Sequence, residues 1–419
     1  MTGVIPAVGQ CNQQPFRALP QGSTKDMLVS RALITLVPLF YAGCVGFRRF
    51  VGRICVKSAV SAFRCARPYR DSPTTFSRSL PQGATSVPGC RNGILAGMIL
   101  VTGGTGFVGQ VLIRRLNEAG YPVRTLIRPS EESPNLPTGI PVNVTLTSLQ
   151  DPRGLQAAMA GVHTVFHLAS AEWFGSYADL TQVDISGTRQ VVDAAVQAGV
   201  QRIFYLSHLG ADRASAFPVL KVKGIAEEYI RNSGLTYTIM RSALLFGPGD
   251  AFTTGLGWLL HASPLFFLLP NEGDSLIQPL AVEDLATAML WALEDDSTRN
   301  QTYEVGGSEF MSLRQAAAIV MDVLGKQRPF VQVSLPYLRT ATVFLENLFP
   351  RLPVSAYWLD YFAADRTCPL DILPRQFHLM PKRFSAPNLR YLRDIRWGRF
   401  LLYTLGRRRG TAAERPKAR

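Results

Sequence analysis

The sequence lacks a run of apolar residues long enough to cross a bilayer comfortably. Its longest run, Ala32–Phe47, has sixteen residues and is interrupted by Pro38, whereas a membrane-spanning helix needs about 20. Cysteine is also scarce, since five of the six precede Met98 and the sixth is Cys368. No CxxC pair or Cys/His spacing indicates a metal site, and a centre without cysteine pairs fits a reducing compartment.

Acidic residues are nearly missing from both ends of the chain. Residues 1–97 contain twelve Lys or Arg and two acids, and residues 375–419 contain 13 basic residues and two acids. Residues 98–374 hold 19 basic and 26 acidic residues, so the centre is mildly acidic. This distribution argues against a nucleic-acid-binding core and predicts basic ends that contact something anionic.

Residues 1–97 show no helical or strand period outside Ala32–Phe47, and three interpretations compete for this basic extension. It resembles a transit peptide in being rich in arginine and poor in acids. It could also be a signal anchor. The third and preferred interpretation is a disordered or untranslated segment ahead of a start at Met98, because acid and cysteine usage change abruptly there.

A strand, a glycine-rich turn and a helix follow one another directly after Met98. Ile99–Thr102 is a short apolar run typical of a buried parallel strand. The turn Gly103–Gly109 comes next, followed by apolar residues at helical spacing up to Gly120. In this context the first glycine permits a tight turn, the second lets the backbone approach a pyrophosphate, and the third allows close packing. The phosphates would meet the free N–H groups of the helix N-terminus, so the pattern predicts a nicotinamide dinucleotide site.

The end of the second predicted strand, Val123–Ile127, bears on the choice of cofactor. An acid at this place bonds the ribose 2′-hydroxyl of NAD, whereas an arginine accommodates the 2′-phosphate of NADP. The chain has Arg128 here and no acid before Glu131. We therefore expect NADP(H), with NAD(H) as the alternative.

Alternating strands and helices continue to about residue 240 and predict a doubly wound, parallel α/β sheet of the Rossmann type. Boundaries are set at 98–250 for the dinucleotide-binding core, at 251–330 for a small α/β substrate-side lobe interleaved with it, and at 331–419 for a helical, basic C-terminal extension. The expected strands are 142–146, 164–168, 202–206, 237–240 and 302–305, and the expected helices are 155–160, 180–198, 221–233, 283–293 and 313–324.

Several motifs together resemble the short-chain dehydrogenase/reductase superfamily, in its extended and atypical branches. The resemblance covers about residues 98–325 and is greatest to the atypical group that contains the nucleotide-binding accessory subunit of respiratory complex I. The matching segments are Thr102–Gly109, Gly161–Ser170, Gly187–Ala195, Tyr205–Ala211, Lys223–Asp250 and Ile277–Ala286.

The resemblance implies further cofactor contacts. Ser148 and Leu149 fall where the family has an Asp–hydrophobic pair near adenine, and Lys223 matches the lysine that bonds the ribose hydroxyls. The full predicted cofactor set is Gly103, Thr105, Gly106, Phe107, Val108, Gly109, Arg128, Ser148, Leu149, Leu168, Ala169, Ser170 and Lys223.

The catalytic positions depart from the family pattern. Active members carry a tyrosine four residues before the lysine as general acid/base, but that position here is Val219, and Phe217 precedes the alternative lysine, Lys221. The family's serine position falls at Ser207 or His208. His208 could transfer protons, or it could be a hydrogen-bonded residue at a strand end, and the similar His167 sits in an apolar strand. The candidate catalytic residues are Lys223, Ser207 and His208, with no metal.

Two segments of the second half bear on the substrate and the membrane. The apolar stretch Leu256–Pro270 is either a wall for an apolar substrate or a lid packed on the core, and its prolines exclude one continuous helix. Residues 389–400 mix aromatics, leucines and arginines at helix-like spacing. That pattern fits a helix docked on its own domain or a helix at an anionic membrane surface, with Leu389, Leu392, Ile395 and Phe400 in the headgroup region.

These observations leave two functions open. One is an NAD(P)-dependent oxidoreductase or epimerase-like enzyme acting on an apolar, quinone- or lipid-like compound or on a nucleotide sugar. The other is a non-catalytic, nucleotide-loaded scaffold or assembly protein of a membrane-associated complex. For the localisation we expect the cytoplasm, peripherally at a membrane, or an organelle if residues 1–97 are a transit peptide.

Overall fold

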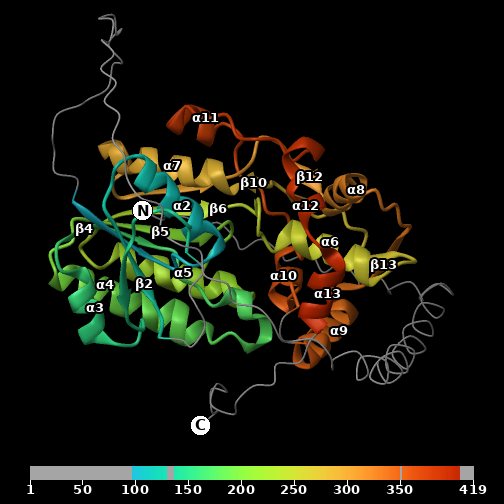
Figure 1. The fold of residues 1–419 in the computed structure, drawn as a ribbon, viewed down its shortest axis with the longest axis horizontal. Coiled ribbons are helices and arrows are strands. Elements are labelled where there is room, and N and C mark those ends of the chain that lie inside the picture. The colour runs from blue at the N-terminus through green and yellow to red at the C-terminus, as the bar shows by residue number, and fades with distance from the viewer. Residues whose placement is uncertain (1–96, 130–135, 350–351, 406–419) are drawn as a thin grey trace, which may run out of the picture. The chain divides into compact units, whose positions relative to one another are not determined.

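A parallel sheet with the strand order β11-β6-β5-β4-β1-β2-β3 forms the centre of the fold (Figure 1). The computed structural model describes residues 97–129, 136–349 and 352–405, so the predictions for residues 1–96 and for Glu131 lie outside the described residues. The sheet consists of β1 (Met98–Thr102), β2 (Val123–Ile127), β3 (Asn143–Leu146), β4 (Val162–His167), β5 (Arg202–His208), β6 (Thr236–Ser242) and β11 (Gln301–Val305). The predicted Rossmann architecture is confirmed.

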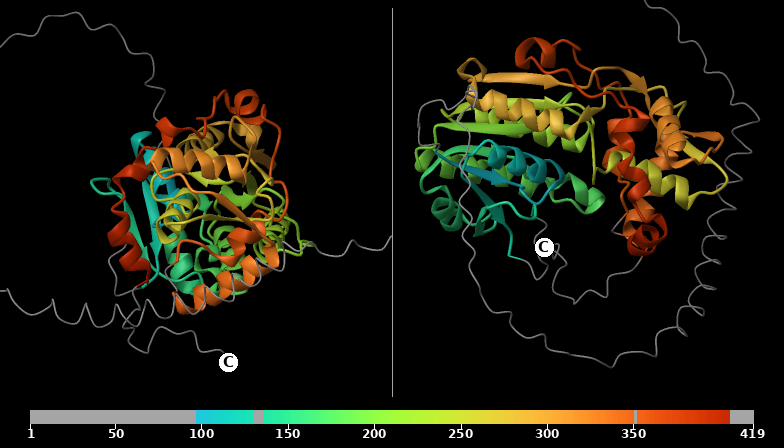
Figure 2. Two further views of the ribbon diagram at one scale, coloured as in Figure 1. Left: turned by 90° about the vertical axis from the view of Figure 1, so that its right-hand side faces the viewer. Right: turned by 45° about the horizontal axis from the view of Figure 1, so that its top comes forward.

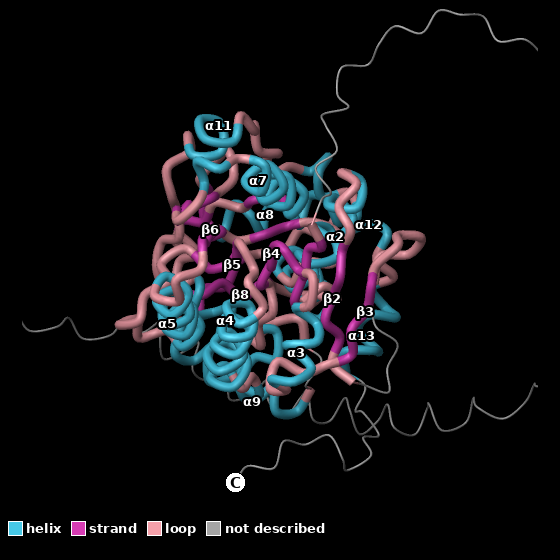
Figure 3. The backbone as a smooth tube through the Cα atoms, turned by 90° about the vertical axis from the view of Figure 1, so that its left-hand side faces the viewer, coloured by secondary structure: helices cyan, strands magenta, loops and turns pink. Residues whose placement is uncertain are grey.

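Helices cover both faces of this sheet because side chains alternate along each strand. On β1, Ile99 and Val101 pack into one hydrophobic cluster, and Leu100 packs into the cluster on the opposite face. The first cluster draws on α2 (Phe107–Glu118), α7 (Val282–Glu294) and α11 (Ile372–Phe377). The second draws on α3 (Pro152–Met159), α4 (Thr188–Gln197) and α5 (Pro218–Arg231). Figure 3 shows helices on either side of the strands.

The strand order reverses between β1 and β4, and this reversal fixes where a ligand binds. From β1 the chain proceeds outward to β2 and β3, and it then returns to β4 on the other side of β1. Loops that leave neighbouring strands at such a point diverge and leave a crevice at the carboxyl ends of the strands. The glycine turn after β1 and residues 168–170 after β4 flank this crevice.

A smaller lobe adjoins the core (Figure 2). It has its own hydrophobic cluster. Its helices are α6 (Phe252–Ala262), α8 (Leu313–Leu324), α9 (Leu335–Leu348), α10 (Ala356–Tyr361), α12 (Tyr391–Asp394) and α13 (Trp397–Leu405). Short strands pair as β10 (Leu280–Ala281) with β7 (Leu245–Phe246), β12 (Met311–Ser312) with β9 (Leu276–Ile277), and β13 (Phe330–Val333) with β8 (Phe267–Pro270).

The boundary between core and lobe differs from the sequence-based prediction. Strand β11 and helix α7 were expected in the lobe, but β11 pairs with β6 in the central sheet and α7 packs with α2 over its face. The chain thus leaves the core after β6, forms part of the lobe and returns. Residues 331–405 likewise do not form a separate extension, because β13 pairs with β8, α13 lies against α6, and α11 packs on the core cluster.

The amphipathic helix predicted at residues 389–400, either docked on its own domain or at a membrane surface, is not present as one helix. The segment contains the end of a short 3₁₀ helix, η4 (Ala386–Leu389), then α12 and the start of α13. Leu389 and Leu392 are fully buried in the lobe, and Ile395 and Phe400 pack against the same cluster. Their apolar side chains therefore stabilise the lobe and are not available to enter a bilayer. No helix of the described ranges is both long and apolar enough to span a membrane.

Candidate functional site

The glycine turn between β1 and α2 has the tight geometry that a phosphate-binding turn requires. Gly103 has φ of 73°, and the Gly106 N–H donates to the Gly103 carbonyl at 3.0 Å. A Cβ on Gly109 would lie 2.3 Å from the Gly103 carbonyl oxygen, so only glycine fits there. No side chain caps the N-terminus of α2, and its first N–H groups are left for an anionic ligand.

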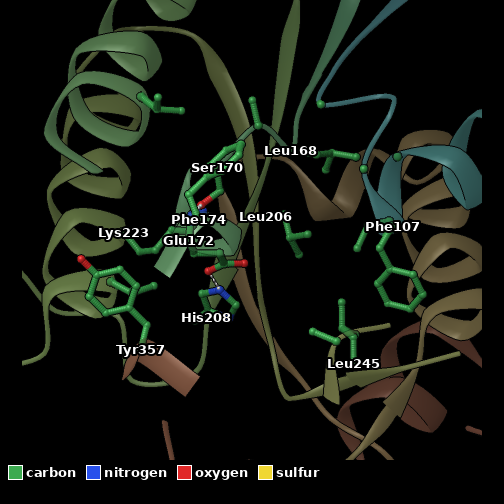
Figure 4. A pocket seen from close by; sticks show the side chains of 18 of the residues that line it. Phe107, Leu168, Ser170, Glu172, Phe174, Leu206, His208, Lys223, Leu245 and Tyr357 are labelled. Carbon is green, nitrogen blue, oxygen red and sulfur yellow. Dashed lines mark hydrogen bonds and ion pairs between the residues drawn. The ribbon is translucent and has the colours of Figure 1, made fainter. Parts of the chain in front are cut away.

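A cavity of about 540 Å³ lies at the carboxyl ends of the strands, next to this turn. Every residue predicted to bind the cofactor lines it, from the glycine turn to Lys223 (Figure 4). Arg128 lines it with its guanidinium 6.0 Å from the ring centroid of Phe174. Ser148 also lines it, and its hydroxyl accepts a hydrogen bond from the Gln150 N–H at 3.2 Å. The structure therefore gathers the predicted cofactor residues in one cavity.

Lys223 is a buried cation inside this cavity. Its Nζ lies 3.3 Å from Oδ1 of Asp184, on the helical turn η2 (Thr181–Gly187), and 5.4 Å from the ring centroid of Tyr205. Burial opposes the charge, but Tyr205, Asp184 and Glu172 outweigh it and raise the pKa of Lys223 above its usual value. Lys223 thus stays protonated, whereas the alternative lysine, Lys221, is exposed on the surface.

His208 and Glu172 form a hydrogen-bonded pair on the substrate side of the same cavity (Figure 4). His208 ends β5, and its Nε2 donates to Oε2 of Glu172 at 2.6 Å, from η1 (Glu172–Tyr177) after β4. Burial alone would raise the pKa of Glu172, but His208 and Lys223 lower it to about 2. The Nδ1 of His208 has no hydrogen-bond partner among the described residues. A positioned imidazole with one free nitrogen is suited to proton transfer.

The other two polar candidates do not reach the cavity. Ser207 is fully buried and does not line it, because it points to the opposite face of β5 from His208. His167 is fully buried between the hydroxyls of Thr102 and Thr188, at 2.7 and 2.9 Å. Burial, with a smaller contribution from Lys223, lowers its pKa to about 3. His167 is therefore a neutral, structural residue.

The position of the family's tyrosine is occupied by an apolar side chain. Val219 lies one turn before Lys223 on α5 and lines the cavity together with Phe217. Tyr357 and Tyr361, on α10, line the cavity from the opposite end of the sequence. Among the described residues that line the cavity, a tyrosine that transfers a proton would therefore have to come from α10.

The substrate side of the cavity contains residues that the sequence did not assign to a site. Glu172 and Phe174 come from η1, and Leu206 comes from β5. Further lining residues come from 242–245, from 250–252 and from 352–361 around α10. The only sequence signal was the aromatic run Tyr357–Phe362. The stretch Leu256–Pro270 instead packs into the lobe core, with Trp258, Leu260 and Phe267 buried there and absent from the cavity lining. Within the described ranges, no cluster of His, Cys, Asp and Glu could hold a metal.

Comparisons with known proteins agree with this geometry. Residues 103–255 match the family described as NAD(P)H-binding. The chain is 27% identical to the mitochondrial NADH dehydrogenase [ubiquinone] 1 alpha subcomplex subunit 9 of Arabidopsis thaliana, over 75% of this chain and 84% of that protein. It is 26% identical to the 2-alkyl-3-oxoalkanoate reductase of Stenotrophomonas maltophilia, over 70% of this chain and 98% of that protein.

Solved structures confirm the fold. The triphenylmethane reductase of Citrobacter sp., complexed with NADP(H), superposes with a TM-score of 0.57 at 24% identity and covers 70% of this chain and 99% of its own. Residues 103–255 carry the NAD(P)H-binding domain, and the chain as a whole is similar to the atypical short-chain dehydrogenase/reductase and NAD-dependent epimerase-like family. It is similar to reductases of that family, and the cofactor that its glycine turn serves is a nicotinamide dinucleotide.

Proposed function

We propose that the protein is a reductase that uses NADPH to reduce a carbonyl-type group on an apolar molecule, with His208 as the proton donor. The observation that carries the proposal is the His208–Glu172 pair, which lies in the same cavity as the predicted cofactor residues and opposite the glycine turn. It supplies the proton-transferring group that Val219 cannot supply.

The residues of the cavity divide the chemistry between them. A reduced nicotinamide, held by the glycine turn and Lys223, would supply a hydride to the carbonyl carbon of the substrate. As the electron pair moves to the carbonyl oxygen, His208 gives that oxygen a proton from Nδ1 and becomes neutral, so the product is an alcohol. Glu172 accepts the Nε2–H of His208 and holds the ring and its charge in place. Lys223, fixed by Asp184, binds the ribose hydroxyls as the family resemblance implies.

Apolar side chains around the reaction site favour a lipid-like substrate over a nucleotide sugar. Phe107, Leu206 and Leu245 surround the space between the glycine turn and His208 (Figure 4). Apolar walls with a few placed polar groups are typical of sites for small apolar ligands, whereas a sugar presents hydroxyls that need partners. The Stenotrophomonas relative is named for a reductase of an alkyl-substituted oxoalkanoate, which is a substrate of this kind.

A second candidate is a nucleotide-loaded protein without turnover that stabilises a membrane-associated complex. Two observations favour it: Val219 replaces the family's tyrosine, and one relative is named as a subunit of NADH dehydrogenase. The test is oxidation of NADPH by the full-length protein with quinones, long-chain ketones, aldehydes and nucleotide sugars. Turnover with an apolar carbonyl supports the reductase. Tight cofactor binding without oxidation by any of these acceptors supports the scaffold.

The choice of NADP(H) over NAD(H) rests on Arg128, which is exposed at the edge of the cavity after β2. We expect NADPH to bind more tightly than NADH, and Arg128→Ala to weaken NADPH binding by about tenfold or more with little change for NADH. Calorimetric titration of both cofactors measures this. A retained preference for NADPH in Arg128→Ala would remove Arg128 from the selection, and Arg153→Ala, outside the cavity, is the control.

Association with an anionic membrane surface at the cytoplasmic face remains a proposal, and it now rests on charge alone. Residues 375–419 contain 13 basic residues and two acidic residues. Arg396 and Arg399, in this segment, are exposed. We expect the full-length protein to float with vesicles that contain phosphatidylglycerol at low salt and to be released at high salt. The double variant Arg396→Gln/Arg399→Gln should bind less. Binding to neutral vesicles, or binding that is insensitive to salt, would contradict the proposal.

A further inference from the structure

Arg366 is a buried arginine between α10 and α11. The whole residue is 8% exposed to solvent. Its backbone is fixed, because its N–H donates to the Leu276 carbonyl at 2.8 Å and the residue forms an isolated bridge with Ile277. The backbone of Arg366 is therefore held at one place, and the residue is almost removed from water.

No acid compensates this charge in the described part of the chain. Each nearby carboxylate is already engaged: Asp360 with Arg339 at 2.9 Å, Glu172 with His208 at 2.6 Å, and Asp365 with the Leu276 N–H at 2.8 Å. Two nitrogens of Arg366, Nε and Nη2, have no hydrogen-bond partner among the described residues. They form one edge of the planar guanidinium, the edge that binds both oxygens of a carboxylate at once.

Two aromatic rings connect Arg366 to the cavity. The guanidinium carbon lies 5.5 Å from the ring centroid of Phe217 and 5.8 Å from that of Tyr361, and both rings line the substrate side of the cavity. The arginine itself lies one layer behind this wall. Cation–π contact with two rings stabilises a guanidinium, but it leaves the N–H groups of the edge without acceptors. A buried charge without a partner is costly, and such groups are normally paired.

We propose that Arg366 binds the carboxylate of the substrate, which reaches its Nε and Nη2 between Phe217 and Tyr361. This inference rests on the proposed reductase function and names its substrate class: an apolar molecule with a carbonyl at His208 and a carboxylate at the far end, that is, an oxo acid. A phosphate has the same bidentate chemistry. The carboxylate is favoured because the surroundings of Arg366 are aromatic and aliphatic, and no described acid forms an ion pair with it.

Direct binding to the NADPH-loaded, full-length protein tests the site without needing turnover. The probes are dodecanoate, its methyl ester and inorganic phosphate, titrated by calorimetry into the wild type, Arg366→Gln and Arg366→Lys. We expect the wild type to prefer the acid over the ester by about tenfold or more, and Arg366→Gln to lose that preference. Arg366→Lys should be intermediate, because it keeps a point charge and loses the planar edge. Arg383→Gln, which alters an exposed pair with Glu309, should behave as the wild type.

Thermal unfolding separates binding from a structural role. If Arg366 awaits a ligand, Arg366→Gln removes an uncompensated charge and should unfold at the same or a higher temperature than the ligand-free wild type. Equal affinity of the wild type for acid and ester would overturn the proposal, and so would displacement of dodecanoate by an equal concentration of phosphate. A clear acid preference in a protein that oxidises no NADPH would leave the anion site standing and remove the reductase. Reduction of neutral ketones and oxo acids at equal efficiency would leave the reductase standing and remove Arg366 as the site for the carboxylate.

Discussion

Replacing Gly109 by alanine should abolish cofactor binding, with the Kd for NADPH rising by about a hundredfold or more. The added Cβ would lie 2.3 Å from the Gly103 carbonyl oxygen and 2.7 Å from the Gly104 Cα. Both are backbone atoms, so the turn itself has to move away from the helix N-terminus. Once the turn no longer aligns with the N-terminus of α2, the N–H groups that bind the phosphates are displaced.

The matched control for this variant is Gly398→Ala. A Cβ at Gly398, within α13, meets no atom within 4 Å, and alanine is favoured over glycine in helices. NADPH affinity should stay at the wild-type value, and stability should be equal or slightly higher. Both variants are compared by calorimetric titration after far-UV circular dichroism has shown that each is folded. Unchanged NADPH affinity in folded Gly109→Ala would show that the dinucleotide does not bind at this turn.

Replacing His208 by glutamine should lower kcat by about 10²–10⁴-fold, the usual contribution of a positioned acid or base, and leave the Kd for NADPH unchanged. Glu172→Gln should have a smaller effect in the same direction. An amide still accepts the hydrogen bond from Nε2, but it lacks the charge that stabilises the protonated ring. Because the pKa of Glu172 is lowered to about 2, this carboxylate stays ionised over the whole neutral and mildly acidic range. The acid limb of the pH profile should therefore not come from Glu172.

His163→Gln is the control for this pair, since His163 is exposed on β4 and does not line the cavity. Steady-state kinetics with a long-chain ketone and a pH profile of kcat/KM separate the roles. Full turnover in His208→Gln, combined with loss of turnover in Tyr361→Phe, would assign the proton to α10. The reductase would then be retained and its proton donor would change.

Local patterns predicted the part of the fold in which neighbouring residues decide the structure. The glycine turn has a sequence signature because its backbone needs glycine, and Val123–Ile127 was predicted to the residue as a short run that begins and ends with aliphatic residues. Strand β11 was also predicted from its local sequence, but which strand it pairs with depends on the path of the chain. Its sequence therefore predicted a strand without placing it beside β6.

The cofactor side of the site was predictable and the substrate side was not. Glycines and the lysine match a family motif, whereas the partners of the catalytic groups come from distant segments. Asp184 reaches Lys223 from η2, and Glu172 reaches His208 from η1. Polar residues of this kind have no local signature. In the tail, Leu389 and Leu392 have the spacing of an amphipathic helix, and this spacing is the same whether the apolar face meets a bilayer or the protein's own core.

Transfer of deuteride tests the central claim most directly. The full-length protein is incubated with NADPH that carries deuterium at the transferable position, together with a long-chain ketone, a long-chain oxo acid whose carbonyl is remote from its carboxylate, and a quinone. The products are analysed by mass spectrometry. If the cavity is a reductase site for apolar carbonyl compounds, the alcohol formed from the ketone or the oxo acid carries the deuterium at its carbinol carbon, and His208→Gln lowers its rate of formation. Saturating binding of the labelled NADPH with no deuterium in any product would contradict the reductase and leave a nucleotide-loaded binding protein.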